Sequence, residues 1–329
     1  MLIKFLRSSF ATQYALILLI AICLYIPTFL FPIIPEITTT ISGPLYEPLS
    51  IFFHAFPLFS VIASFIILLF QAYFFNSILA ANGLINRQSV YGTFVYVLLF
   101  SQSPHQLGMY PSLVAGIFIL FALSILFGLE DKTENQMYIF NSSILVSLAS
   151  MFYLPALILI FWLWIALLMS RSGSFRELLI PIVGLITPYF FLASWYYFKN
   201  QLFGNASEYL DIFKLFDFEK INPDWSVLVI WIIIILILFQ FSYIILGVSG
   251  EKNAVIRKKK SITITLLFFS IPGVFYNDSQ IMHNGLIILP IAVLISYSLA
   301  NVRKRLIPEI LLWLLLVSII ANHYLPYFT

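Results

Sequence analysis

The stretch PEITTTISGPLYEPLSIFFH, residues 35–54, separates two long apolar runs near the start of the chain. It contains Glu36 and Glu47, which are the carboxylates of the first quarter of the chain, and it ends in His54. Almost everything around this polar gap is apolar. Chemistry, if the protein performs any, is therefore expected in gaps of this kind and not within the apolar runs.

The composition decides the class of protein. Of the 329 residues, 61% are hydrophobic and 9% are charged, whereas a soluble domain carries roughly 45–50% apolar and about 25% charged residues. This excess of apolar surface is too large for one core, so lipid is expected to be the solvent for much of it. No stretch between the apolar runs is long enough for a soluble domain. Residues 1–329 are therefore predicted to form a single integral membrane domain.

The apolar runs predict an all-α fold, a polytopic transmembrane helical bundle of about 11 spans, since one span needs about 20 apolar residues. The predicted spans are 12–34, 51–75, 91–104, 110–128, 138–152, 153–170, 178–198, 225–248, 262–276, 285–301 and 309–326. The runs 91–104, 138–152 and 262–276 are short, which leaves tilted, re-entrant or half-spanning helices open there.

The basic residues test this map, because cytoplasmic loops of membrane proteins carry an excess of Lys and Arg. With a cytoplasmic N-terminus, fourteen of the 17 basic residues fall on the inner side, and Lys199, Lys214 and Lys220 fall on the outer side. The C-terminus is then outside. The expected location is a bacterial cytoplasmic (inner) membrane. The basic run 257–260 is expected to reflect this topology and contact with anionic lipid.

The interior of the predicted spans lacks charge, since no Asp, Glu, Lys or Arg falls near the middle of a span. Charges inside spans usually mark proton relays, ion sites or gating elements. Their absence argues against an ion-coupled pump, although unwound backbone carbonyls also bind ions.

Acidic and imidazole side chains gather on the outer side of the map. They include Glu36, Glu47, His54, His105, His283 and His323. Glu47 and His54 lie seven residues apart, which is two helical turns, so they share a face if the second span begins early. Pro48 would then stand in the first turn with Glu47 at the cap.

Two external loops are predicted, at 35–50 and 199–224. Within the second, Tyr209, Ile212 and Phe216 recur at helical spacing. This pattern indicates an amphipathic helix on the membrane surface over about 206–218. The helix is either an interfacial anchor or a wall beside a groove for a lipid substrate.

Several motifs are missing from the sequence. Its glycines form no phosphate-binding loop, and no His-x-x-x-His or His-Glu-x-x-His pair is present to hold zinc. No cofactor is predicted; the outer acids and histidines permit a divalent cation, but none has ligand spacing. The basic run is short and lies on a membrane face, so no nucleic-acid partner is expected.

Three features together resemble the GT-C class of polyprenyl-phosphate-sugar glycosyltransferases. These are the acidic loop after the first span with Glu36 and Glu47, the short middle helices with a small external turn at 103–106, and the run 150–188. The resemblance is architectural and covers roughly residues 12–225. It departs from the class in having two glutamates eleven residues apart, where an Asp-rich or Glu-Asp pair is common, and in lacking a large C-terminal extramembrane domain.

As a whole, the chain also resembles uncharacterised, very hydrophobic integral membrane proteins of Bacteroidota, a likeness that brings no activity with it. The GT-C resemblance implies a membrane glycosyltransferase that moves a sugar from a polyprenyl-phosphate carrier at the outer face of the membrane. It implies membrane lipid, a polyprenyl-phosphate-linked sugar and other membrane proteins as partners.

Under this resemblance, Glu47 or Glu36 is the catalytic base. The substrate- and phosphate-binding residues would be His54, His105, Lys199 and His283. Lysine would replace arginine as the phosphate ligand, because the outer side of the map has no arginine. Two other functions stay open: a non-catalytic membrane subunit or scaffold of an envelope assembly, and a transporter for lipids or other amphiphiles.

Overall fold

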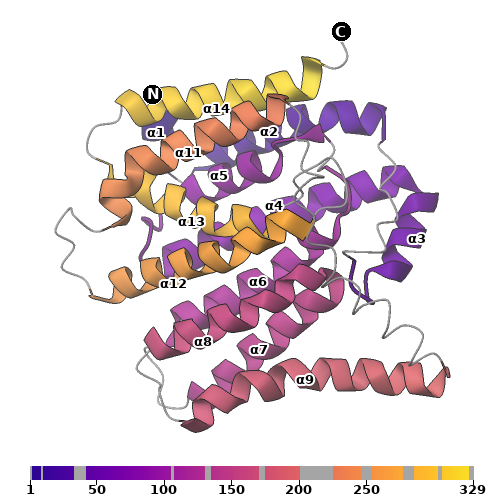
Figure 1. Cartoon of the computed structure of the whole chain (residues 1–329). Helices are drawn as coiled ribbons and strands as arrows, with labels where there is room; N and C mark the ends of the chain where they lie inside the picture. Colours follow the sequence, from indigo (N-terminus) through magenta and orange to yellow (C-terminus); the bar gives the residue numbers. More distant parts are fainter. Residues whose placement is uncertain are drawn as a thin grey trace.

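The computed structural model describes residues 2–8, 10–32, 42–104, 107–129, 135–169, 175–200, 225–246, 254–276, 285–302 and 306–325. Within these ranges the protein is all-α, with 13 α-helices and the 3₁₀ helices η3 (Leu154–Ile158) and η6 (Ile271–Tyr276) (Figure 1). The α-helices are α1 (Leu2–Phe5), α2 (Ala11–Leu30), α3 (Glu47–Ala55), α4 (Pro57–Ala81), α5 (Tyr91–Phe100), α6 (Pro111–Phe127), α7 (Asn135–Phe152), α8 (Leu159–Met169), α9 (Phe175–Phe198), α11 (Trp225–Ile245), α12 (Ala254–Ser270), α13 (Gly285–Asn301) and α14 (Leu306–Tyr324).

Five of these helices are long and apolar enough to cross a membrane. They are α2, α4, most of α9 (Glu177–Phe198), α11 and α14. Shorter apolar helices accompany them, among them α5, α6 and α13. Every apolar run predicted from the sequence contains a helix. The all-α prediction is therefore confirmed, and the five long apolar helices indicate an integral membrane protein.

The predicted second span differs from the structure, because the run 51–75 contains parts of two helices. α3 ends at Ala55 and α4 begins at Pro57, with Phe56 between them at φ −130° and ψ 74°. Proline lacks an N–H and disfavours a helical conformation in the residue before it, so the helix breaks here. α3 itself begins at Glu47 with Pro48 in its first turn. The last residues of the predicted loop 35–50 are therefore helical.

Two sets of contacts define the ends of the bundle. At the N-terminal end, the Val90 N–H donates to the Leu6 carbonyl over 3.0 Å and the Leu2 N–H donates to the Glu309 carboxylate over 2.7 Å. At the C-terminal end, the turn after α5 contacts the last turn of α14. Figure 1 shows the two termini at these opposite ends.

The N-terminal end also buries two members of the basic run 257–260. Lys259 donates from Nζ to the carbonyl of Asn82, the C-cap residue of α4, over 3.2 Å. Lys260 donates from Nζ to the carbonyl of Ile244, in the last turn of α11, over 3.3 Å. An ammonium at a helix C-terminus satisfies free carbonyls and complements the helix dipole. These two lysines therefore join helices, and Arg257 stays exposed.

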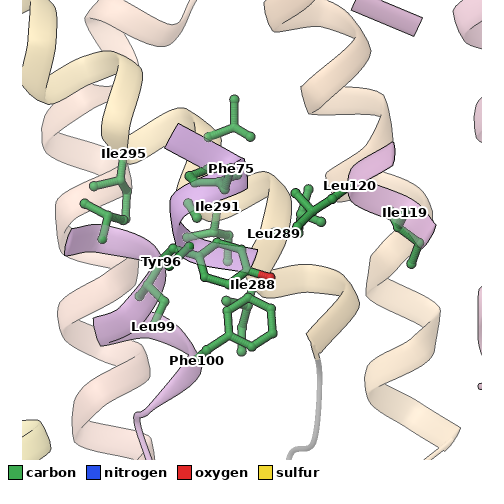
Figure 2. Packing of buried hydrophobic residues seen from close by; sticks show 14 of the residues in the cluster. Phe75, Tyr96, Leu99, Phe100, Ile119, Leu120, Ile288, Leu289, Ile291 and Ile295 are labelled. Carbon is green, nitrogen blue, oxygen red and sulfur yellow. The ribbon is translucent and has the colours of Figure 1, made fainter. Parts of the chain in front are cut away.

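The centre of the bundle is built from α5 and α13, which are apolar on all sides. All ten residues of α5 are buried, and α13 is buried from Gly285 to Leu299 except at the partly buried Ile287. Figure 2 shows Tyr96 and Phe100 of α5 beside residues of α13, and the two rings stack with centroids 4.3 Å apart. A helix that is hydrophobic all round belongs inside a protein or a membrane. At 1.5 Å per residue, α5 is about 15 Å long, half of a hydrocarbon core of about 30 Å.

Polar side chains of α4 donate to backbone carbonyls in the segment between α5 and α6 and in the first turn of α6. The Gln71 amide donates to the Leu113 carbonyl over 2.7 Å and accepts from the Tyr96 hydroxyl over 2.8 Å. Nearer the C-terminal end, the Ser64 hydroxyl donates to the Leu107 carbonyl over 2.6 Å. Non-helical backbone at membrane depth is tolerated where protein groups satisfy it. These two side chains therefore satisfy one carbonyl in the segment before α6 and one in the first turn of α6.

Candidate functional site

A groove of about 930 Å³ lies at the C-terminal end of the bundle, between the segment that enters α3, the end of α7 and the second half of α9. We call it the α3–α9 groove. Its lining residues are Pro44, Leu45, Glu47, Pro48, Ile51, Ile144, Leu148, Met151, Thr187, Pro188, Phe191, Leu192, Trp195, Tyr196 and Lys199. Its volume is at the upper end of the range of about 300–1,000 Å³ for small-molecule sites.

The wall formed by α9 is held against α7 by a seam of small residues. The two backbones are so close at Gly184 that a Cβ there would lie 2.5 Å from the Cβ of Ser143. The Ser147 hydroxyl donates to an α9 carbonyl over 2.8 Å, and the hydroxyls of Ser150 and Tyr189 are 2.8 Å apart. Small residues allow close approach of helices in a membrane. This seam positions the groove-lining half of α9.

The opposite wall is held by residues 42–46, which we call the strap. The Gly43 N–H donates to the Phe152 carbonyl over 2.9 Å, and the Leu45 N–H donates to the Met151 carbonyl over 3.0 Å. A Cβ at Gly43 would lie 2.0 Å from the Met151 carbonyl oxygen, so only glycine fits this approach. The strap therefore ties the start of α3 to the end of α7.

Tyr46 completes this attachment just before α3. Its side chain is buried, and its hydroxyl donates to the carbonyl of Met109 in the segment after α5. Burial raises the pKa of the Tyr46 phenol well above its usual value, with a smaller contribution from the neighbouring Tyr110. The phenol therefore stays neutral and keeps the proton that it donates. Glu47, the first residue of α3, is therefore positioned by two attachments just before it, from the strap to α7 and from Tyr46 to Met109.

The structure brings together two of the residues predicted from the sequence, Glu47 and Lys199. Both are exposed and both line the α3–α9 groove, from α3 and from the turn after α9. The Lys199 Nζ lies 4.9 Å from the centre of the Trp195 ring, which favours a cation there. The groove lining therefore contains one carboxylate and one ammonium among the described residues.

The groove is apolar apart from these charges and the hydroxyls of Thr187 and Tyr196. Ile51 on α3 is 59% exposed and Phe191 on α9 is 68% exposed, so the groove is open between these two helices. Aromatic and aliphatic side chains thus frame its opening. A long apolar chain with a polar head group would fit this distribution of surfaces.

The other predicted site residues are not brought into this groove. His54 lies in the last turn of α3, on the same short helix as Glu47, but it is exposed and is not among the groove-lining residues of the described ranges. Glu36, His105 and His283 lie outside the described residues, as does the predicted surface helix at 206–218. Their roles stay predictions.

Tyr196 and Thr187 also line the groove, although no motif in the sequence marks them as site residues. One face of α9 carries a stripe of groove residues at helical spacing, namely Pro188, Leu192 and Trp195, followed by Lys199. That spacing was the signal available in the sequence. Because α9 is apolar on most of its surface, the stripe could not be told from its lipid-facing neighbours.

No cluster of three or more His, Cys, Asp or Glu side chains suited to a metal ion occurs within the described ranges. No family model, curated protein or solved structure matches the chain. The class that the fold defines is therefore a helical membrane protein with several candidate spans, and no family is identified.

Proposed function

We propose that the protein is a GT-C-like membrane glycosyltransferase that takes a polyprenyl-phosphate-linked sugar into the α3–α9 groove. The observation that carries this proposal is that Glu47 and Lys199 line one groove with apolar walls. A carboxylate, an ammonium and a long apolar surface are the three groups that such a substrate requires. The resemblance to the GT-C class in the order of loops and short helices adds to this argument.

The proposed orientation puts the groove at the outer face of a bacterial cytoplasmic membrane. Arg7, Arg87 and Lys260 belong to the N-terminal end of the bundle, which the excess of basic residues assigns to the cytoplasm. An odd number of crossings, such as the eleven predicted, puts the two termini on opposite sides. The groove, at the other end, would then face the outer leaflet.

In the proposed complex, the isoprenoid tail lies on the apolar groove wall formed by Leu148, Met151 and Leu192. The opening between α3 and α9 admits the tail sideways from the lipid. The phosphate lies at Lys199, where the ammonium balances its charge as a point charge. The sugar is then held between Lys199 and Glu47.

The proposed chemical step is a transfer at the anomeric carbon of the sugar. The Glu47 carboxylate accepts the proton of the acceptor hydroxyl while the acceptor oxygen forms a bond to that carbon. The bond from that carbon to the phosphate oxygen breaks, and its electron pair leaves with polyprenyl phosphate. A positioned base contributes about 10²–10⁴-fold to the rate.

The test is sugar transfer by the full-length protein in proteoliposomes, with undecaprenyl phosphate carrying a radiolabelled hexose as donor. Glu47→Gln is expected to lower the transfer rate about 10²-fold or more, with unchanged binding of the donor. Lys199→Gln is expected to weaken donor binding. Glu177→Gln, the same change at the cytoplasmic end of α9, is the matched control. Wild-type transfer rates in Glu47→Gln would contradict the proposal.

A non-catalytic membrane subunit is the second candidate. It is favoured by the fact that Glu47 is the one carboxylate among the groove-lining residues of the described chain. In that case the wild-type protein binds polyprenyl phosphate in the groove but transfers no sugar. Donor binding without turnover, abolished by Lys199→Gln, would identify this function.

A further inference from the structure

A buried polar turn follows the half-length helix α5, and its residues Ser101 and Gln102 are not among those that line the α3–α9 groove. Ser101 and Gln102 are both 0% exposed, although α5 ends at Phe100 inside the bundle. Among the described residues, the Ser101 hydroxyl and both the nitrogen and the oxygen of the Gln102 amide have no hydrogen-bond partner. A buried amide without partners loses its hydration and gains nothing in exchange.

The backbone of the same turn is satisfied by α14. Asn322 donates from Nδ2 to the Gln102 carbonyl over 2.9 Å, and the His323 Nε2 lies 2.7 Å from the Ser101 carbonyl oxygen. The turn is thus held in place by its main chain. Its two side chains are held inside the protein without taking part in that attachment.

We infer that the Ser101–Gln102 turn binds ordered water at the junction of α5 and α14. The Gln102 amide has two donors and an acceptor oxygen, and the Ser101 hydroxyl both donates and accepts. A cation would satisfy the oxygens and leave the amide N–H groups without partners, and an anion would do the reverse. Water donates and accepts, and a buried water typically makes about three hydrogen bonds to groups of this kind.

The water acts as a link between the end of α5 and its surroundings, since α5 is too short to cross the bundle alone. Polar groups freed by a helix that ends at membrane depth are satisfied by neighbouring side chains and ordered water. Protein groups alone satisfy the buried amide of Gln71, which contacts Leu113 and Tyr96 directly. The side chains of the Ser101–Gln102 turn are satisfied by ordered water instead.

This site is tested by whether a substitution raises or lowers the Tm of the full-length protein, measured by thermal unfolding in detergent. Gln102→Met keeps the length of the side chain and removes its amide. If water satisfies the amide, the variant loses hydrogen bonds and its Tm falls by about 2–4 °C or more. If the amide has no partner, the variant relieves a penalty and its Tm stays the same or rises, which overturns the inference.

A double-mutant cycle adds a readout that simple packing would not produce. Ser101→Ala is expected to lower the Tm by itself, and to lower it less in the Gln102→Met background, because both side chains share the water. Gln71→Met is the matched control for a buried amide that protein groups satisfy. Equal effects of Ser101→Ala in both backgrounds contradict a shared water.

If the two Tm measurements disagree, the question is settled by a structure of the protein in lipid at a resolution that shows ordered water. The expected result is density about 2.7–3.2 Å from the Gln102 amide and within hydrogen-bond reach of the Ser101 hydroxyl. Density for an ion, or side chains packed against apolar atoms with no density between them, overturns the inference.

Discussion

Gly184 lies where α7 and α9 approach each other most closely, and its replacement tests how the groove wall is held. A Cβ at this position would lie 2.5 Å from the Cβ of Ser143 and 3.1 Å from the Phe140 carbonyl oxygen. Ordinary contacts of this kind begin at 3.4 Å. Gly184→Ala therefore requires the two helices to separate by about 0.9 Å, and overpacking on this scale costs about 1–3 kcal/mol.

The helix propensity of alanine opposes this cost, because Ala is about 1 kcal/mol more favourable than Gly within a helix. A double-mutant cycle removes this term. Ser143→Gly deletes the atom that Gly184→Ala would meet, so the double variant recovers the stability that the clash cost. The expected coupling is about 1–3 kcal/mol in favour of the double variant.

The assay is thermal unfolding in detergent followed by tryptophan fluorescence. At about 2–4 °C per kcal/mol, the coupling corresponds to about 2–12 °C between the observed Tm of the double variant and the additive value. Gly116→Ala in α6 is the control, because its nearest neighbour would lie at 3.6 Å, an ordinary contact. Additive effects of Gly184→Ala and Ser143→Gly would refute the argument that the small residues hold the seam.

Two further predictions concern the strap and the buried lysines. Gly43→Ala puts a Cβ 2.0 Å from the Met151 carbonyl oxygen, so the strap must detach from α7. We expect weaker binding of polyprenyl phosphate in a vesicle-binding assay. Binding as tight as that of the wild type would contradict the role of the strap. Lys260→Met removes an ammonium that caps α11 and lies 5.0 Å from the Tyr297 ring, so we expect a loss of about 1–2 kcal/mol in the free energy of unfolding. Arg257→Met, at an exposed position of the same helix, is expected to change it by less than about 0.5 kcal/mol.

The sequence predicted which segments are helical, because a run of about 20 apolar residues has few other stable forms in a membrane. It also carried the signal for the break at Phe56 and Pro57, since proline disfavours a helical residue before it. The prediction of one helix over 51–75 was wrong, because Pro57 disfavours a helical conformation at Phe56 and the run divides between α3 and α4. Glu47 and Lys199 were named as site residues under the resemblance to the GT-C class and from their place outside the apolar runs, and their roles stay predictions.

The sequence could not show how the buried lysines or the small residues are used. Lys259 and Lys260 belong to a basic run that is typical of a cytoplasmic face, and only packing shows that they cap α4 and α11. The serines of α7 gain their role from Gly184 on another helix. Such pairs are invisible in one sequence, because each partner by itself is an ordinary residue.

The amino-acid sequence by itself determined that the chain is a set of apolar helices joined by polar gaps. Only the tertiary structure decided that α5 and α13 form the centre while α9 lies at the edge, and that Glu47 and Lys199 line one groove. The physical reason is that hydropathy measures the transfer of a side chain out of water. It does not distinguish a neighbour that is lipid from one that is another helix.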